Sequence, residues 1–166
     1  VGVTCTGETN KLASGLVGKV IEFDVASSTW GPIVLTFPLN YQKGCALVNS
    51  LTGNMGCAWK SWSDNPYDAQ AIQVALAWGV SNPQPIISEI EFDQTGAMVI
   101  DITDRGGWQW GYKNLPPLNA AEIFPGVQNP LDRSNQLHDS YAAGDQLRAC
   151  ASGAVYSFES NGSCGG

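Results

Sequence analysis

Charged residues are scarce in this sequence of 166 residues: they make up 14% of it, against roughly a quarter in an average soluble protein. Only eight are Lys or Arg, and no basic stripe is present that would bind nucleic acid or an anionic membrane. Long hydrophobic runs are lacking too, since none approaches the roughly 18 residues of a membrane-spanning helix. The sequence predicts no nucleic-acid partner and no membrane span.

Histidine occurs once, at His138, and the cysteines include no Cys-x-x-Cys pair. A zinc site needs closer ligand spacing than this. A Ser-His-Asp catalytic set would need a nucleophile motif such as Gly-x-Ser-x-Gly, which is missing. We therefore predict no catalytic residue and no resident cofactor, and an enzyme is the less favoured class.

A calcium ion is the one cofactor that the sequence allows. Its candidate ligands are Asp132, Asn135 and Asp139, whose oxygens are spaced along one short stretch. The stretch lacks the ligand order and the Gly of an EF-hand.

Apolar residues make up 43% of the chain, and Gly (19), Pro (9) and Trp (6) are plentiful. This composition suits an all-β fold with many turns. Alternating patterns predict strands at 1–6, 18–25, 33–39, 86–93, 97–103, 145–149 and 154–159. The apolar spacing over 68–78 fits a helix about as well as a strand, and that segment stays open.

The strands fall into two similar groups. Each group has a Gly-led strand, a short polar turn and a strand ending near a Phe, which is typical of repeated β-propeller blades. We therefore expect residues 1–166 to be a fragment of a propeller with about two four-stranded blades. Blade-like units are expected at 1–39 and 86–160, with insertions at 40–85 and 106–144.

The five cysteines indicate disulfides and an oxidising compartment, extracellular or at the cell surface. Cys45 and Cys57 bracket a Gly/Asn-rich stretch, and Cys150 and Cys164 bracket the last hairpin, so these are the expected pairs. Cys5 is left over, which implies a partner outside the chain or another pairing. The start at Val1 without a signal peptide suggests a processed or excised part of something larger.

A group of aromatic side chains is the principal candidate for binding carbohydrate or protein: Trp59, Trp62, Trp108, Trp110 and Tyr112. Flat rings exposed on a loop stack on sugars or on protein partners. The alternative, which we favour, is that they fill gaps between the blades.

The stretches EFDQTGAMVIDITDRGGWQWGYKN, AAGDQLRAC and FESNGSCGG resemble a propeller-like region of very large secreted bacterial surface proteins that carry SdrD/Cna-B-type repeats. VGVTCTGETN, FPLNY and WKSWSD resemble the earlier part of that region. The most specific pieces are Asp-Arg-Gly-Gly at 104–107 and Gly-Asp-x-Leu-Arg at 144–148. The resemblance implies an extracellular, surface-associated role and carries no catalytic motif.

Two blades are fewer than the four to eight of a closed propeller, so apolar faces should be covered by the rest of the parent polypeptide or by other copies. The leading hypothesis is a non-enzymatic structural or adhesive module of a bacterial surface protein or filament. The alternative is a secreted carbohydrate-binding or carbohydrate-active propeller, with a surface glycan as partner. A self-contained β-sandwich is the third possibility.

Overall fold

The computed structural model describes residues 1–7, 12–45, 56–62, 72–74, 78–81, 83–109, 137–140, 144–159 and 164. Strands dominate this part of the chain. They are β1 (Gly2–Thr6), β2 (Leu16–Asp24), β3 (Thr29–Pro38), β4 (Ile72–Val74), β5 (Trp78–Ser81), β6 (Pro85–Phe92), β7 (Met98–Asp104), β8 (Leu137–Ser140), β9 (Asp145–Ser152) and β10 (Val155–Phe158). A single 3₁₀ turn, η1 (Ala13–Gly15), and one short helix, α1 (Arg105–Gln109), complete the described elements.

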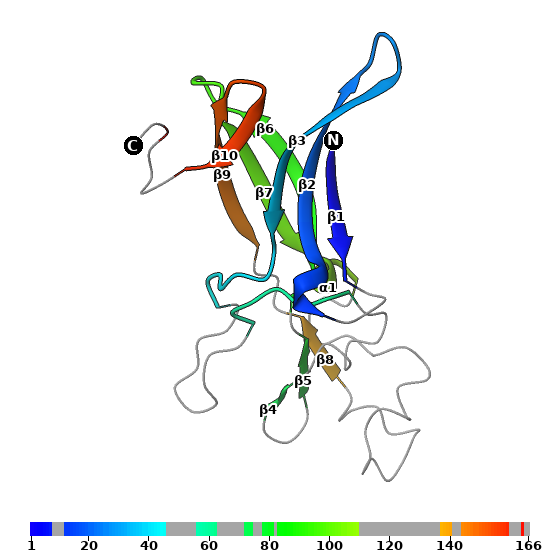
Figure 1. Cartoon of the computed structure of the whole chain (residues 1–166). Coiled ribbons are helices and arrows are strands. Elements are labelled where there is room, and N and C mark those ends of the chain that lie inside the picture. The colour runs from blue at the N-terminus through cyan, green and yellow to red at the C-terminus, as the bar shows by residue number, and fades with distance from the viewer. Residues whose placement is uncertain are drawn as a thin grey trace.

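The strands form two larger antiparallel sheets and one small sheet (Figure 1). The first has the order β1-β2-β3 and the second the order β10-β9-β7-β6, and in both every pair is antiparallel. The small sheet, β4-β5-β8, contains the parallel pair β5 and β8. All but one of the neighbouring pairs in the two larger sheets join strands that follow closely in sequence.

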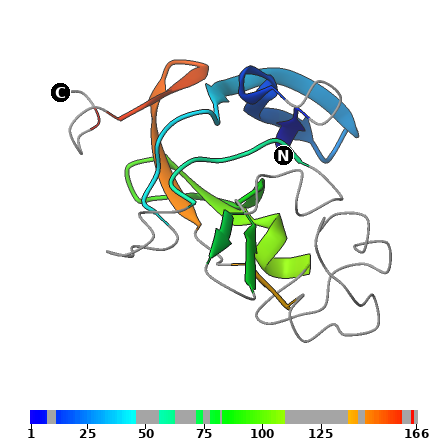
Figure 2. The ribbon, with the colours of Figure 1, turned by 90° about the horizontal axis from the view of Figure 1, so that it is seen from below.

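The two larger sheets pack face to face around one hydrophobic core, with the blue sheet over the green and orange one in Figure 2. Both sheets contribute buried side chains to this core: Leu16, Val20, Leu35, Phe37, Met98, Ile100, Ile102 and Ala149. The layers meet at both edges. On one edge the backbone N–H of Ile87 donates to Thr4 Oγ1 over 3.3 Å, and on the other the rings of Phe37 and Phe158 lie 5.2 Å apart.

The alternation along each strand decides which face is buried. On β7, Met98, Ile100 and Ile102 point into the core, whereas Asp101 lies on the outer face and accepts from Gln146 Nε2 over 2.8 Å. An antiparallel sheet with one apolar and one polar face is typical of a two-layer structure. We call the end with α1 the α1 end, and the opposite end, with the turn between β2 and β3, the hairpin end.

The structure confirms the all-β class, the seven expected strands within a few residues and both expected disulfides, Cys45–Cys57 and Cys150–Cys164. A propeller ring is not shown by the described residues. Strands β4 and β5 lie in the expected insertion 40–85, and β8 and all of α1 except Arg105 lie in the expected insertion 106–144. Residues 72–74, in the segment left open, are a strand. No helix among the described residues is long and apolar enough to cross a membrane.

Candidate functional site

Asp104, the last residue of β7, is completely buried at the α1 end. Its Oδ1 accepts the backbone N–H groups of Gln84 and Gly106, each over 2.8 Å, and its Oδ2 accepts that of Gly107 over 3.2 Å. Gly106 and Gly107 are in the first turn of α1, where N–H groups have no partner within the helix. Asp104 therefore starts the helix and ties it to the chain before β6.

Tyr41 and Lys43 lie beside this carboxylate, on the segment that follows β3. Tyr41 Oη donates to Asp145 Oδ2 over 2.6 Å, and burial, followed by this bond, raises the tyrosine pKa well above its usual value. The Lys43 ammonium lies 4.4 Å from the ring centre of Trp59, which is itself only 1% exposed. Burial lowers the Lys43 pKa, while the negative charges of Asp104 and Asp145 act in the opposite direction. Tyr41 and Lys43 thus connect the segment after β3 to Asp145 and Asp104 of the second sheet.

Arg105 links the start of α1 to the chain before β6. Its Nη1 donates to Gln84 Oε1 over 2.9 Å, and its guanidinium lies 4.7 Å from the ring centre of Trp62. Trp62 Nε1 donates in turn to the carbonyl of Pro85 over 2.8 Å. A planar cation stacked on an aromatic ring stabilises this contact by about 0.5–1 kcal/mol.

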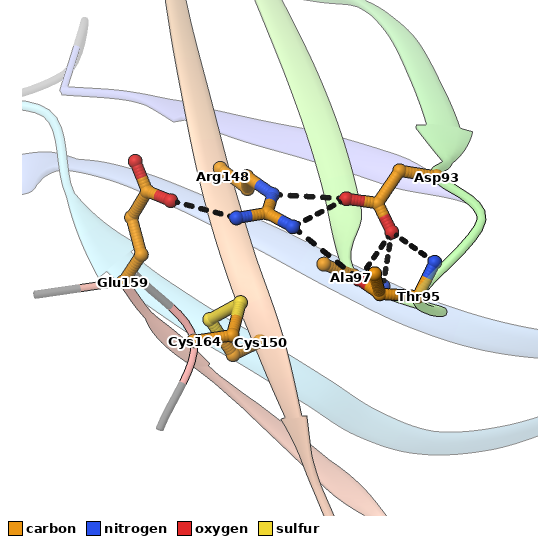
Figure 3. The surroundings of a disulfide bond; sticks show 7 residues. All are labelled: Asp93, Thr95, Ala97, Arg148, Cys150, Glu159 and Cys164. Carbon is orange, nitrogen blue, oxygen red and sulfur yellow. Dashed lines mark hydrogen bonds and ion pairs between the residues drawn. A yellow bond between two sulfur atoms is a disulfide. The ribbon is translucent and has the colours of Figure 1, made fainter. Parts of the chain in front are cut away.

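Arg148, in the middle of β9, makes a second cluster toward the hairpin end (Figure 3). Its Nε and Nη2 both donate to Asp93 Oδ2, and its Nη1 donates to Glu159 Oε2 over 3.1 Å. Asp93 also accepts from the backbone and hydroxyl of Thr95 and from the backbone of Ala97. Hydrogen bonds from Thr95, followed by those from Arg148, lower the Asp93 pKa well below its usual range.

A cleft of about 630 Å³ opens between the two sheets at the hairpin end. Its walls are mainly apolar and come from both layers, including Ile21 and Val34 from the first sheet and Ile90 and Tyr156 from the second. We call it the hairpin-end cleft. Clefts of this size with apolar walls and few polar groups are typical binding sites.

The predicted aromatic group does not form one surface. Trp59 is part of the hydrophobic core and Trp62 is half-buried under Arg105, whereas Trp108 on α1 is 78% exposed. The indole N–H of Trp108 donates to Thr103 Oγ1 over 3.0 Å, which fixes one side of the ring. Trp110 and Tyr112 lie outside the described residues.

Two of the predicted calcium ligands, Asp132 and Asn135, lie outside the described residues, and Asp139 is described only as a backbone position in β8. His138 is likewise described only by its backbone. Within the described part of the chain, no three His, Cys, Asp or Glu residues gather as metal ligands. Calcium binding at these residues stays a prediction.

The sequence analysis identified the stretches that contain the Asp104 and Arg148 clusters, but it did not predict which residues these side chains contact. Asp-Arg-Gly-Gly at 104–107 contains the helix-starting carboxylate and the stacked Arg105, and Gly-Asp-x-Leu-Arg at 144–148 contains Asp145 and Arg148. Lys43 lies outside every motif. Tyr41 ends the stretch FPLNY, but its contact with Asp145 joins distant parts of the chain, so that stretch does not reveal the partner. The hairpin-end cleft was missed for the same reason.

Comparison with known proteins finds two colossins of Dictyostelium discoideum. Colossin-A is 28% identical over 165 residues, which are 99% of this chain and 1% of Colossin-A. Colossin-C is 26% identical over 106 residues, which are 64% of this chain and 9% of Colossin-C. No family model matches the chain. No solved structure matches it either.

The expectation of a bacterial surface protein with SdrD/Cna-B-type repeats is wrong. The relatives found are proteins of Dictyostelium discoideum, a eukaryote. The two most specific stretches of that resemblance, at 104–107 and 144–148, carry hydrogen bonds within this fold.

Proposed function

We propose that the chain is a non-enzymatic structural or adhesive module of a long extracellular polypeptide. The alignment with Colossin-A places nearly the whole chain against about a hundredth of that protein, as expected for one module among many. The polar clusters support a structural role because their carboxylates bind backbone N–H groups and arginine within the fold.

The observation that carries this proposal is the placement of the two disulfides. Cys45–Cys57 closes a loop beside the α1 end, where Lys43 N donates to the carbonyl of Cys57 over 2.8 Å. Cys150–Cys164 ties β9 to the chain beyond β10, next to the Arg148 cluster (Figure 3). Disulfides persist in oxidising compartments, and they stabilise the folded state against unfolding.

The test is a disulfide map of the protein isolated from its source cells under thiol-blocking conditions. We expect Cys45–Cys57 and Cys150–Cys164 to be oxidised, and protease treatment of intact cells or of the medium to release peptides of this chain. Recovery of all five cysteines as thiols, from protein protected inside the cells, would overturn the proposal.

We further infer that the two sheets form a complete two-layer module rather than two blades of a ring. Further blades would have to cover the outer faces, and those faces carry polar pairs such as Asp101 with Gln146 and Asp93 with Arg148. Small-angle X-ray scattering of the purified chain distinguishes the two, because a ring assembled from several copies has a much larger radius of gyration.

Carbohydrate binding is the second candidate, and the exposure of Trp108 is the observation that favours it. Its ring stands on α1 with one edge fixed by Thr103, as a stacking platform for a sugar would be. A glycan array with the purified chain and with Trp108→Ala tests this. Signals that vanish in the variant support it, and an empty array overturns it.

A further inference from the structure

Trp108 stands beside the polar outer face of the second sheet. Its indole N–H donates to Thr103 Oγ1 over 3.0 Å, and the residue is 78% exposed. Thr103 and Asp101 are two positions apart on β7, so both side chains lie on this outer face, opposite to the buried Ile102. Two strand residues span about 7 Å, so a ligand that contacts the ring can also reach Asp101.

Exposed polar side chains lie next to Asp101 on both neighbouring strands. Gln146 of β9 donates from its Nε2 to Asp101 Oδ1 over 2.8 Å. On the other side Glu89 of β6 lies opposite Asp101, and a β-bulge leaves the exposed Ser88 beside it. Bulges redirect side chains and are frequent next to functional sites. Within the described part of the chain, no protein group binds the Glu89 carboxylate.

These groups are the ones that hold a sugar. An aromatic ring packs against the C–H groups of a sugar, carboxylate oxygens accept from its hydroxyls, and an amide side chain both donates and accepts. A protein partner would instead be marked by contiguous exposed apolar groups. The exposed side chains around Asp101 are Ser88, Glu89 and Gln146, and all three are polar.

The charge of this face disfavours acidic sugars. Glu89 and Asp101 lie opposite each other, and Glu91, two positions along β6, is also exposed. The guanidinium of Arg148, on the same face of β9, already binds two carboxylates. Since the whole chain also carries a net charge of −7, a uronic acid or a sulfated sugar would be repelled.

We propose that the outer face of the second sheet binds an uncharged oligosaccharide at a site formed by Trp108, Asp101, Gln146 and Glu89. One sugar unit packs against the ring of Trp108, and hydroxyls of the adjoining unit bond to Asp101 and Gln146. Glu89 accepts from a further hydroxyl. The proposal deepens the carbohydrate-binding candidate above and rests on it, because it names the class of sugar and the polar side chains that hold it.

The first experiment titrates the ¹⁵N-labelled chain with neutral trisaccharides of glucose, mannose and galactose, and with their uronic-acid counterparts. We expect at least one neutral trisaccharide to shift the indole N–H resonance of Trp108 and the side-chain amide of Gln146, and the uronic acids to leave both unchanged. Trilysine is the probe for a basic protein partner. The proposal is overturned if no neutral trisaccharide shifts these resonances, if the uronic acids bind equally well, or if trilysine binds there more tightly than every trisaccharide.

Variants of exposed residues test the two halves of the site, with affinity followed at the backbone amides of residues 101–103. Trp108→Ala should weaken binding by about threefold to tenfold through loss of the ring contact. Gln146→Ala should weaken it by about twofold to tenfold through loss of a hydrogen bond. The matched controls are Trp30→Ala, at a residue 63% exposed at the hairpin end, and Gln94→Ala, at an exposed residue of the turn between β6 and β7. Both controls should leave the affinity unchanged.

Circular dichroism melts establish that each variant is folded before binding is measured. A control that loses as much affinity as its partner variant would contradict the proposed site. A glycan array then separates this proposal from the candidate on which it rests. Signals that depend on Trp108 but survive Gln146→Ala, or that come from acidic glycans, overturn the proposed site and leave the carbohydrate-binding candidate in place. An array without signals overturns both, and neither result changes the disulfide map or the exposure of the chain on cells.

Discussion

Buried carboxylates are costly unless their oxygens are bonded, and Asp104 accepts the backbone N–H groups of Gln84, Gly106 and Gly107. Two of these donors are glycines of the following turn, and Gly106 is itself buried. The requirement for Asp followed by small residues thus has a local origin. Asp104 also bonds the backbone N–H of Gln84, 20 residues earlier in the chain. A helix-start motif in the sequence does not predict this long-range contact.

Asp104→Ala should lower the free energy of unfolding by about 2–4 kcal/mol. It removes the helix cap, worth about 1 kcal/mol, and leaves buried N–H donors without an acceptor, at about 1–3 kcal/mol. Urea denaturation measures the loss. Asp101→Ala on the outer face of the same strand is the control, and it should cost less than about 1 kcal/mol because its bond to Gln146 is exposed. Equal losses in the two variants would contradict the role given to Asp104.

The Arg148 cluster makes stability depend on pH. The pKa of Asp93 is lowered in the folded chain, so the group contributes stability above its unfolded pKa of about 4, and this contribution is lost as the pH falls toward the folded pKa. We expect the urea midpoint to drop below about pH 4 in the wild type and to drop less in Asp93→Asn. Arg148→Gln should reduce the same acid dependence, because its hydrogen bonds to Asp93 contribute to the low pKa. An unchanged acid limb in Asp93→Asn would contradict this assignment.

At the scale of single elements, β2 and β3 depend on one glycine. Gly18 lies opposite Phe37 in the antiparallel register, and a Cβ at residue 18 would come within 2.2 Å of Phe37 Cζ. Phe37 is only 1% exposed and contacts Phe158 on the other sheet, so the ring covers the glycine and fills the core at once. An aromatic residue that covers a glycine on the neighbouring strand also holds the register.

Gly18→Ala should therefore lower the free energy of unfolding by about 1–3 kcal/mol, the usual cost of overpacking a core. Gly96→Ala is not a suitable control, because residue 96 has a positive φ of 81°. Gly44→Ala is the matched control, since a Cβ there meets nothing within 4 Å. Thermal or urea unfolding of both variants measures the difference, and a Gly18→Ala variant as stable as Gly44→Ala would show that the ring moves aside freely.

The elements that sequence reasoning found are those whose partners are near in sequence. The hairpins β2–β3 and β6–β7 have strong alternation and short turns, so both strands and their pairing follow from local pattern. The parallel pair of β5 and β8 joins residues 78–81 to 137–140, and the sequence of neither stretch predicts the other as its pairing partner. Helix α1 was missed because its sequence, Arg-Gly-Gly-Trp-Gln, has weak intrinsic helix propensity and depends on Asp104.

At the scale of the whole molecule, the alternation of apolar and polar residues along the strands predicts which face of each sheet is apolar. It does not predict which part of the molecule covers that face. A ring of blades and a two-layer module bury the same residues of β2 and β7, and they differ only in whether the outer faces are polar and whether the edges of the sheets meet. The sheets meet at one edge through Thr4 and Ile87 and at the other through Phe37 and Phe158. These are tertiary contacts, and the residue pattern of a single strand does not predict them. The candidate cleft follows from the same packing.

A shared core predicts that the two sheets unfold together. Leu35 and Ile100 come from different sheets, are 5% and 0% exposed, and belong to one cluster. Ile100→Ala should lower the free energy of unfolding by about 2–5 kcal/mol, through lost burial and a residual cavity. Because the cluster is continuous, amides of β2 and of β7 should lose protection against hydrogen exchange by the same amount.

Leu35→Ala, in the other sheet, is the matched variant for this measurement. It should lower protection in β7 as much as in β2, since each sheet provides the apolar surface against which the other is buried. Two sheets with separate cores would respond differently: the mutated sheet would lose protection and the other would keep it. Selective loss of this kind, in either variant, would show that the sheets are independent units and would restore the expectation of separate blades.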